Sequence, residues 1–314
     1  MGILSSLCAD IVNVTEQAAI ACYDWIGKGD NEAADAAAVE SMRKNLNLMN
    51  ISGTIVIGEG ERDEAPMLYI GEQVGRGGVA VDIALDPLEG TTICANAAES
   101  SLAVIAFAQQ GGFLHAPDVY MDKIAVGANL PQDVIDLDNS PKANLTNLAK
   151  AKKCDISDLM VMILKRDRHK ELIAKVREAG AKIRLIGDGD VAGVIACANQ
   201  EIKIDAYMGI GGAPEGVLAA AAIKMIGGQM MGRLIFDNNE KQIERAKKMG
   251  ISDLNKKYSA EEMAKGEVIF CCSGVTDGYM LNGVKKTPNH ISVSSLLMDS
   301  AQKKIIRTNS LVIS

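Results

Sequence analysis

The chain has 314 residues, of which 48% are hydrophobic and 23% charged, an ordinary composition for a soluble globular protein. Its net charge of −7 and its aromatic content of 4% argue against binding of nucleic acid by a basic surface or by stacked aromatic rings. An acidic surface also repels phosphorylated substrates. A phosphate-binding site here therefore needs positive charge from a metal or from a few placed Arg and Lys side chains.

The cysteines and the hydropathy indicate a cytoplasmic protein without a membrane partner. The seven cysteines have neither the spacing of a disulfide framework nor that of a zinc site, so free thiols in a reducing compartment are expected. No apolar run is long enough to cross a membrane. Met1-Gly2 with Ser6 formally fits a myristoylation signal, but it lacks a polybasic neighbour.

The first part of the chain is predicted to form two helices followed by strands. These elements are expected at residues 10–26, 31–48, 54–57, 79–85 and 101–108. The strand at 79–85 should end at Asp86, because Pro87 cannot continue the hydrogen-bond ladder.

Beyond residue 155, strands and helices alternate, which predicts a doubly wound α/β unit. Strands are expected at 159–164, 182–186, 204–208, 268–272 and around Ser292 and Ile305, and helices at 168–179, 191–197 and 215–225. Ser259 and Glu262 form a capping-box pattern for another short helix. A polar stretch at 140–155 places the boundary between domains of residues 1–150 and 151–314.

The segment from Asp82 to Thr92 carries the clearest chemical signal. Asp86 and Glu89 lie three residues apart on a predicted turn, and two such carboxylates can converge on one or two hard cations. Gly90 permits close approach of the backbone, and Thr91 places a hydroxyl beside the metals. The alternative interpretation is a strand end with solvated acids.

Further acids favour a metal site. Asp35 lies on the apolar stripe of its predicted helix, where an acid must be paired, protonated or metal-bound. Taken alone, Asp35 would be a charge that meets the helix dipole, and Glu59 and Glu61 would form an acidic turn. Together with Asp86 and Glu89, they could build an all-oxygen site, which suits Mg²⁺ or Mn²⁺ better than zinc.

Two glycine-rich loops follow in the second half. The loop at 187–190 superficially resembles a dinucleotide loop, but its third Gly is one residue late. Asp188 and Asp190 would face a pyrophosphate unfavourably and are better suited to accept hydrogen bonds from sugar hydroxyls. In the loop at 209–216, Glu215 either complements a helix dipole or is a fifth metal ligand.

Positive side chains cluster where a predicted strand enters a helix. They are Lys165, Arg166, Arg168 and His169. A helix start with Arg is a reasonable anion site, and a solvated helix turn is the alternative.

Longer strings in this sequence are similar to motifs of one family. The string Asp86-Pro87-Leu88-Glu89-Gly90-Thr91 resembles the D-P-x-[DE]-G-T motif of the lithium-sensitive metal phosphatases, which include inositol monophosphatases and fructose bisphosphatases. The strings at 53–61, 63–71, 188–190 and 209–216 narrow the resemblance to class II, GlpX-type fructose-1,6-bisphosphatases.

The resemblance implies an α/β protein with the layered α-β-α-β-α fold of the sugar phosphatases, assembled as a homodimer or homotetramer. It implies metal-dependent hydrolysis of the 1-phosphate of fructose 1,6-bisphosphate to fructose 6-phosphate and phosphate, in gluconeogenesis. The cofactor would be Mn²⁺ or Mg²⁺ and the substrate a sugar bisphosphate. Residues 1–150 would bind the metal, and residues 151–314 would bind the substrate.

The functional residues of the family carry over onto matching positions. Metal ligation falls on Asp35, Glu59, Asp86, Glu89 and Glu215. The catalytic residues would be Thr91, Asp35 and Glu59. Substrate contacts fall on Glu89, Gly90, Thr91, Tyr120, Arg166, Asp167, Arg168, Asp188, Gly189, Asp190 and Gly212.

Three positions depart from the pattern of some relatives and leave substrate preference open. Asn31 stands in place of Lys, Thr92 in place of Arg, and Asp167 in place of Pro between the two arginines. Sedoheptulose-1,7-bisphosphatase activity, alone or beside the first, is therefore an alternative, as is inositol monophosphatase activity. A non-catalytic nucleotide-binding protein, built on the loop at Gly187, is a further alternative.

Overall fold

The computed structural model describes residues 2, 4–60, 67–199, 201–237 and 239–313. Internal contacts divide the chain into two units, Met1–Leu114 with Ala264–Ser314, and His115–Met263. The boundary expected after residue 150 differs from this division, since it falls inside helix α4 (Pro141–Lys152) of the second unit. The last fifty residues belong with the first 114 because strand β11 (Val268–Gly274) pairs with strand β4 (Leu102–Gln109) over seven residue pairs.

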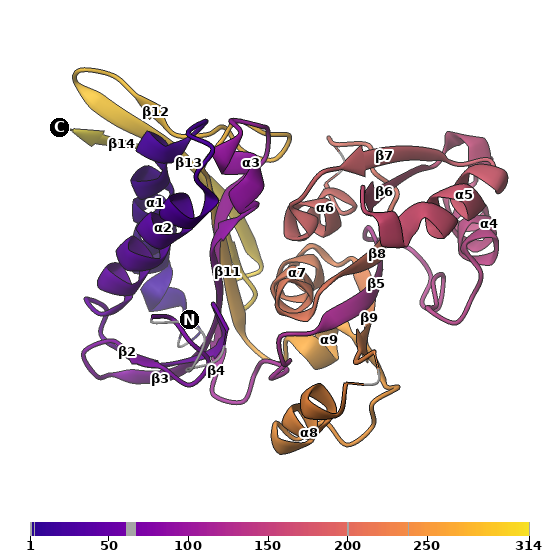
Figure 1. Cartoon of the computed structure of the whole chain (residues 1–314), viewed down its shortest axis with the longest axis horizontal. Coiled ribbons are helices and arrows are strands. Elements are labelled where there is room, and N and C mark those ends of the chain that lie inside the picture. The colour runs from indigo at the N-terminus through magenta and orange to yellow at the C-terminus, as the bar shows by residue number, and fades with distance from the viewer. Residues whose placement is uncertain (1, 3, 61–66, 200, 238, 314) are drawn as a thin grey trace. The chain divides into compact units, whose positions relative to one another are not determined.

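The first unit is a sheet that carries two long helices (Figure 1). Its strands follow the order β12-β13-β11-β4-β3-β1-β2, and β14 pairs with β13. The helices are η1 (Leu4–Leu7), α1 (Cys8–Cys22), η2 (Tyr23–Trp25), α2 (Asn31–Leu46) and α3 (Thr91–Ala95). The remaining strands are β1 (Ile51–Ile57), β2 (Gln73–Val74), β3 (Val79–Glu89), β12 (Lys285–Lys286), β13 (His290–Asp299) and β14 (Lys304–Ile313).

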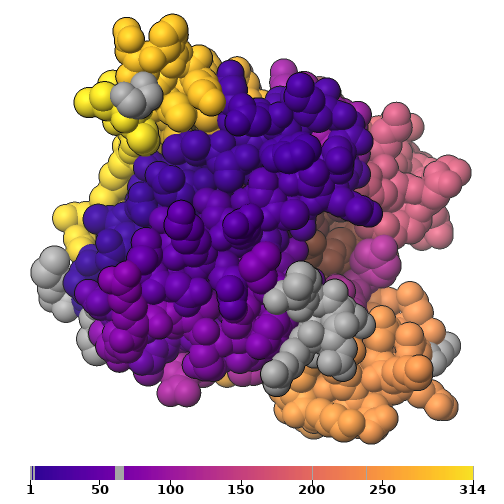
Figure 2. Space-filling view, turned by 60° about the vertical axis from the view of Figure 1, so that its left-hand side comes forward, coloured from indigo at the N-terminus to yellow at the C-terminus, as the bar shows by residue number. Residues whose placement is uncertain are grey.

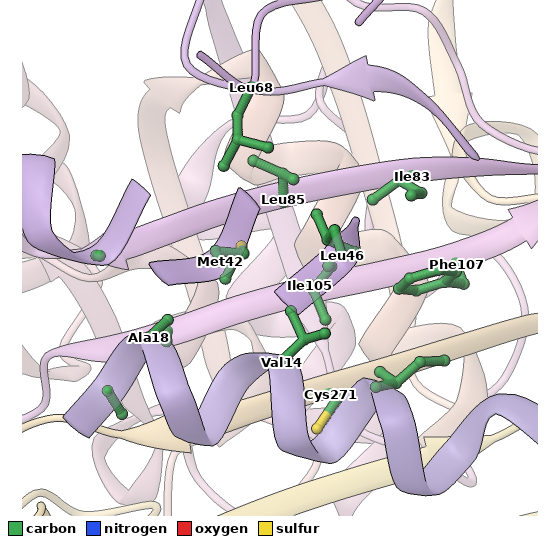
Figure 3. Packing of buried hydrophobic residues seen from close by; sticks show 14 of the residues in the cluster. Val14, Ala18, Met42, Leu46, Leu68, Ile83, Leu85, Ile105, Phe107 and Cys271 are labelled. Atoms are coloured by element: carbon green, nitrogen blue, oxygen red, sulfur yellow. The ribbon is translucent and has the colours of Figure 1, made fainter. Parts of the chain in front are cut away.

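The core of this unit lies between the two helices and the sheet (Figure 3). Val14 and Met42 project from α1 and α2, and Ile105 and Phe107 project from β4; all four are fully buried or nearly so. The helix predicted from the apolar stripe at 39, 42 and 46 is confirmed, and the side chain of Asp30 caps its first turn by accepting from Ala33 N–H at 3.0 Å.

Helix α1 is also tied to the C-terminal strands by polar contacts. Ser295 and Ser310 donate to Oε1 of Glu16 at 3.0 and 2.7 Å. Figure 2 shows the indigo N-terminal helices and the yellow C-terminal strands on the same face of the molecule. Segments nearly 300 residues apart in sequence therefore pack against each other.

The second unit contains a mixed six-stranded sheet in the order β10-β9-β5-β8-β6-β7. Its strands are β5 (Tyr120–Val126), β6 (Met160–Leu164), β7 (Lys182–Ile186), β8 (Ala206–Gly212), β9 (Gln229–Ile235) and β10 (Lys257–Ser259). Its helices, besides α4, are η3 (Ile156–Asp158), η4 (Asp167–His169), α5 (Lys170–Glu178), α6 (Asp190–Ala196), α7 (Ala213–Ile226), α8 (Glu240–Lys248) and α9 (Ala260–Met263). The predicted capping box is confirmed, with Ser259 N–H donating to Glu262 at 2.9 Å.

The expectation of a doubly wound unit holds only for part of this sheet. Strands β6, β7 and β8 are parallel, as the alternating pattern predicts. Strand β5, however, is antiparallel to both β8 and β9, which makes the sheet mixed. Of the helices in the described residues, none combines the length and apolar character needed to span a lipid bilayer.

Candidate active site

Strand β3 does not stop at Pro87, contrary to the expectation from the sequence. It pairs with β4 through Asp86↔Val104 and again through Glu89↔Leu102, so three steps along β3 match two steps along β4. The extra residue forms a bulge, which accommodates the missing N–H of Pro87 without ending the strand. Asp86 Oδ1 accepts from Leu88 N–H at 3.1 Å within this bulge.

The bulge places Asp86 and Glu89 on the same face of the sheet. In a regular strand, residues three apart point to opposite faces. Their partners Val104 and Leu102, however, are two apart on β4 and therefore share a face, and directly paired residues lie on the same side. Asp86 and Glu89, which the sequence predicted on a turn, therefore lie on a bulged strand and point to the same side of the sheet.

Glu59 belongs to the same edge of the sheet. Strands β1 and β3 are parallel, with Ile57 opposite Ala84, so their carboxyl ends meet at one edge. Glu59 follows β1 by two residues, and its N–H donates to the carbonyl of Leu68 at 3.1 Å. Glu61, the other acid predicted here, lies outside the described residues, as do positions 63–66 of the motif.

Asp35 lies on α2 near the beginning of α3, which starts with Thr91. Asn31, in the first turn of α2, donates to the hydroxyl of Thr92 at 3.5 Å and so joins the two helix starts. Asp35 follows one turn later and is partly buried, and this desolvation raises the pKa of its carboxyl. Two of the positions that depart from the family pattern, Asn31 and Thr92, thus contact each other.

The second unit contains a cavity of about 540 Å³ at the carboxyl edge of its parallel strands. Strands β6, β7 and β8 end there, and the antiparallel strand β5 starts there with Tyr120 opposite Gly212. The cavity is lined by Asp118, Val119, Tyr120, Leu164, Arg166, Arg168, Asp188, Asp190, Gly211, Gly212, Glu215, Ile235, Asp237, Asn239 and Gln242. Ligand sites of open α/β sheets commonly lie at this edge.

Two arginines from the loop after β6 line the cavity. Arg166 donates to the carbonyl of Gly187 and, at 3.4 Å, to Oδ1 of Asp188. Arg168 donates through Nε and Nη2 to the carbonyl of Ile210 at 3.0 and 2.9 Å. Its guanidinium lies 4.6 Å from the ring centroid of Tyr120.

Asp167 differs from its two neighbours. Its side chain is 93% exposed and pairs with Lys170 at 3.0 Å, and it is not among the residues that line the cavity. Its carboxylate is therefore paired with Lys170 in solvent, which lessens its opposition to the charges of Arg166 and Arg168.

A buried ion pair lies beneath the cavity. Lys123, which is 1% exposed, donates to Oδ2 of Asp190 and, at 2.8 Å, to the carbonyl of Gly212. Tyr207 also donates to Asp190 Oδ2, at 3.5 Å. Desolvation raises the pKa of the neighbouring Asp188, and the charge of Arg166 partly offsets that rise.

Glu215 lies in the first turn of α7 and lines the cavity. Its Oε2 atom is buried and has no hydrogen-bond partner within the part of the chain that the structure describes. Desolvation, followed by the charge of Asp190, raises the pKa of Glu215 to about 7, against the opposing effect of Lys123. A Cβ on Gly212 would lie 1.9 Å from the same Oε2, so only glycine leaves room for this carboxylate.

The predicted metal ligands fall into two sets. Asp35, Glu59, Asp86 and Glu89 belong to the first unit and Glu215 to the second. Within the described residues, no three His, Cys, Asp or Glu side chains form a cluster that could hold a metal ion. The orphaned buried oxygen of Glu215 and the all-oxygen donor set fit a hard divalent cation, and the assignment of the five ligands stays a prediction.

Several cavity residues escaped the sequence analysis. Asp118, Asp237, Asn239 and Gln242 lie in stretches without glycine or arginine patterns. The role of Lys123, beneath the cavity, was not predicted. Lysine is rarely buried, and the strand that contains this residue was not recognised in the sequence. Gly189, the predicted contact between the two aspartates, is the left-handed N-cap of α6, with φ of 82°.

Comparisons with known proteins agree with this description. The model of the family "Bacterial fructose-1,6-bisphosphatase, glpX-encoded" matches residues 5–311. A protein of Trichodesmium erythraeum (strain IMS101), named D-fructose 1,6-bisphosphatase class 2/sedoheptulose 1,7-bisphosphatase, is 44% identical over 94% of this chain and 92% of its own length. A protein of Prochlorococcus marinus (strain MIT 9515) with the same name is 45% identical over 98% and 96%.

Among solved structures, inositol monophosphatase from Anabaena (Nostoc) sp. PCC 7120 aligns with a TM-score of 0.33 and 15% identity, covering 63% of this chain and 73% of that one. The family model, in contrast, spans nearly all of both units. The chain therefore belongs to the family of bacterial, glpX-encoded fructose-1,6-bisphosphatases.

Proposed function

We propose that this protein hydrolyses the 1-phosphate of fructose 1,6-bisphosphate to give fructose 6-phosphate and phosphate, a reaction of gluconeogenesis. The observation that carries the proposal is the cavity of the second unit, in which two arginines and two aspartates lie at one strand edge. Phosphate needs the first kind of side chain and sugar hydroxyls the second. Membership of the family and the names of its relatives support the same substrate.

Arg166 and Arg168 would bind the phosphate that is not cleaved. Both lie at the end of β6, and Arg168 is supported from behind by Tyr120 and by the carbonyl of Ile210. A guanidinium that is already oriented loses less side-chain entropy when it binds a phosphate. Asp167, predicted as a further substrate contact, would act through its backbone, since its carboxylate faces solvent.

Asp188 and Asp190 would orient the sugar through its hydroxyls, with Gly189 and Gly212 shaping the backbone around it. Asp190 is fixed by Lys123 and Tyr207, so its carboxylate is held before the substrate arrives. Such preorganisation reduces the entropic cost of binding. The half-exposed ring of Tyr120 offers an apolar surface for the sugar carbons.

The reacting phosphate would be neutralised by a bound metal, since acidic side chains alone would repel it. The predicted ligands of that metal are Asp35, Glu59, Asp86, Glu89 and Glu215. A bound divalent cation, Mn²⁺ or Mg²⁺, supplies neutralisation of phosphoryl oxygens and activation of water. Glu89, Gly90 and Thr91 would contact the substrate at this end, where Thr91 is partly exposed at the start of α3.

Thr91 would supply the catalytic hydroxyl, with Asp35 and Glu59 as the acids that assist it. The hydroxyl would orient the attacking water, whose proton passes to a carboxylate while the bond between phosphorus and the C1 oxygen breaks and that oxygen takes up a proton. If the hydroxyl attacks in line itself, a water then hydrolyses the resulting phosphothreonine. The pKa of Asp35 is raised by desolvation, which favours such an acceptor role. Phosphoryl transfer needs positioning and charge neutralisation more than covalent chemistry, so few groups suffice.

Hydrolysis of sedoheptulose 1,7-bisphosphate is the second candidate, because both reported relatives carry that activity in their names. The two substrates share the distal phosphate and the ketose end, so the same arginines and aspartates would bind both. Inositol monophosphatase activity is less favoured, since a monophosphate leaves the two arginines without a ligand. The non-catalytic nucleotide-binding alternative gives no function to the aligned acids of β3.

We also propose a cytoplasmic location and a homo-oligomeric state for the enzyme. The first is in keeping with seven free cysteines, five of them buried, in the described residues. Such thiols persist in a reducing compartment.

The position of cleavage tests the proposal directly. Product formed from fructose 1,6-bisphosphate is passed to phosphoglucose isomerase and glucose-6-phosphate dehydrogenase with NADP⁺, a pair of enzymes that together oxidise fructose 6-phosphate but not fructose 1-phosphate. We expect NADPH in equal amount to the phosphate released. Phosphate release without NADPH would mean that the 6-phosphate is cleaved and would contradict the assigned orientation; a parallel assay with sedoheptulose 1,7-bisphosphate decides between single and dual activity.

A further inference from the structure

His169 is a buried titratable residue that the proposed reaction does not use. It ends η4, immediately after Arg168, and is only 1% exposed. Its Nδ1 lies 2.7 Å from the carbonyl oxygen of Leu164, and its Nε2 lies 2.8 Å from the backbone nitrogen of Ile210. Both ring nitrogens therefore have backbone partners, one on β6 and one on β8.

These partners select one form of the ring. A carbonyl oxygen only accepts, so Nδ1 must carry a proton, and a backbone N–H only donates, so Nε2 must present its lone pair. Only the neutral Nδ1–H tautomer satisfies both contacts. The neutral form is also favoured because burial lowers the pKa of His169. The hydrogen bond to Leu164 opposes this shift, and the charges of Arg168 and Arg166 add to it.

The backbone of Ile210 joins His169 to the candidate phosphate site through its N–H and its carbonyl. His169 accepts from the N–H of Ile210, while Arg168 donates two hydrogen bonds to its carbonyl. The guanidinium so held lies over the ring of Tyr120 at 4.6 Å. A movement of Ile210 would therefore carry the guanidinium of Arg168 with it.

Gly209 makes room for this arrangement. Its φ of +148° is rarely adopted by other residues, and a Cβ there would lie 3.1 Å from two atoms of the His169 ring. The ring therefore packs directly on the backbone of β8, which restricts its rotation.

We propose that His169, in its neutral Nδ1–H tautomer, is a positioning residue that orients Arg168 through the backbone of Ile210 and thereby sets the affinity for the uncleaved phosphate of the substrate. The proposal rests on the function proposed above, in which Arg168 binds that phosphate. His169 touches neither the substrate nor the reacting atoms. Its effect should consequently appear in binding and leave the chemical step nearly unchanged.

Two substitutions of similar polarity separate the two ring contacts. Asn places an amide near the position of Nδ1 and can donate to Leu164, but it cannot reach Ile210. Gln extends an amide oxygen toward the position of Nε2 and can accept from Ile210, but it loses the bond to Leu164. Each variant keeps one of the two hydrogen bonds, so a purely structural role predicts similar losses of stability and equal KM values.

The expected result is a split between these variants. His169→Asn should raise KM for fructose 1,6-bisphosphate about fivefold, with kcat within about twofold of the unsubstituted enzyme, because one hydrogen bond that holds Ile210 is lost. His169→Gln should keep KM near the original value. An unchanged KM in His169→Asn, or an equal rise in both variants, would overturn the proposal.

A binding measurement distinguishes failure of this proposal from failure of the proposed function. Calorimetric titration with fructose 6-phosphate in chelator reports the phosphate subsite without catalysis. We expect weaker binding to His169→Asn than to His169→Gln, even if the enzyme were to cleave another bisphosphate. Absence of any fructose 6-phosphate binding by the unsubstituted protein would overturn the assigned subsite and His169 with it.

The tautomer can be read in the unsubstituted protein, which covers the case that a variant does not fold. Long-range ¹H–¹⁵N spectra distinguish the two tautomers and the imidazolium, and His115 and His290 variants assign the signals. Protonated Nδ1 with unprotonated Nε2 at neutral pH is expected for His169. The opposite tautomer or a charged ring would contradict the proposal.

Discussion

Lys123 of β5 donates to Asp190 at the start of α6, and both side chains are buried, with 1% and 7% of their surface exposed. The lysine also donates to the carbonyl of Gly212, which pairs with Tyr120 across the strand ladder. One cation thus connects a predicted hydroxyl-binding carboxylate with the backbone that precedes Glu215. The ion pair therefore supports the floor of the cavity.

Replacement of this lysine should destabilise the protein strongly. Lys123→Met leaves the carboxylate of Asp190 buried without its counter-ion, and loss of one partner of a buried pair costs about 3–5 kcal/mol. Urea denaturation measures the change. The double variant Lys123→Met with Asp190→Asn should regain much of the lost stability, because no unpaired charge stays buried. As a control, Lys152→Met breaks a more exposed ion pair with Asp205 and should lower stability by less than about 1 kcal/mol. A Lys123→Met variant as stable as the original would show that the pair is unimportant.

Substitution of Gly212 should weaken metal binding more than folding. The φ of Gly212 is −62°, which alanine adopts readily, but the added Cβ would meet Oε2 of Glu215 at 1.9 Å. Gly212→Ala must therefore displace that carboxylate. We expect a higher Mn²⁺ concentration for half-maximal activity and little change in thermal stability. Gly187→Ala, where a Cβ would meet open space, is the matched control; equal metal dependence in both variants would remove Glu215 from the ligand set.

Removal of the hydroxyl of Thr91 should abolish turnover in a folded protein. Thr91→Val preserves shape at the start of α3 and deletes the group proposed to orient or perform the attack. A positioned catalytic group contributes about 10²-fold or more to rate, so kcat should fall by at least that factor. Thr92→Val, one residue later and exposed, tests whether the site tolerates the same change nearby. Full activity of Thr91→Val would refute the catalytic assignment.

Loss of Arg168 should act on affinity for the bisphosphate. Arg168→Ala removes a charge-assisted hydrogen bond to phosphate, and bonds of this kind contribute about 1.5–3 kcal/mol, or roughly 10- to 150-fold. Steady-state kinetics should show the rise in KM. Arg177→Ala, on the exposed side of α5, is the control. It removes one positive charge, as Arg168→Ala does, but should leave KM unchanged. Identical KM values for the two variants would exclude a phosphate contact at Arg168.

His169 should make stability depend on pH. Its folded-state pKa lies below the ordinary value of 6.5, chiefly because of burial, so the unfolded chain takes up the proton first as pH falls. The contribution of His169 is complete above pH 6.5 and is lost as pH falls through the folded-state pKa. The stability advantage over His169→Gln, measured by denaturation, should therefore shrink as the pH falls through the ordinary histidine pKa of about 6.5 and below it. A constant difference would mean that the ring is not held neutral.

Helices and strands with a regular pattern of apolar residues could be predicted from the local sequence. The helix at 31–46 was visible from its apolar stripe, and β7 at Lys182–Ile186 was predicted with the observed bounds. The loop predicted at 187–190 lies between β7 and α6, where the alternation of strand and helix placed it. Residues 209–212, predicted as part of a second loop, instead form the end of β8, because they pair with β5. Arg166, Arg168, Asp188 and Asp190 consequently line one cavity, as the order of strands along an α/β sheet favours.

Non-local features could not be predicted in the same way. The bulge at Pro87 depends on pairing with β4, and the return of the chain into the first sheet depends on β11 meeting β4. Strand β5 was missed because Asp122 and Lys123 interrupt its apolar pattern, and only burial against Asp190 and Gly212 explains a lysine there. The structural importance of His169 is likewise set by backbone partners on β6 and β8 that no sequence motif reveals.

The central claim, metal-dependent hydrolysis of a sugar bisphosphate, is tested most directly by release of phosphate from fructose 1,6-bisphosphate. The purified chain is assayed with Mn²⁺, with Mg²⁺ and with excess chelator. We expect release with a divalent cation and none in chelator, with activity restored when the metal is returned. Folded protein that releases no phosphate from fructose or sedoheptulose bisphosphate with either metal would contradict it.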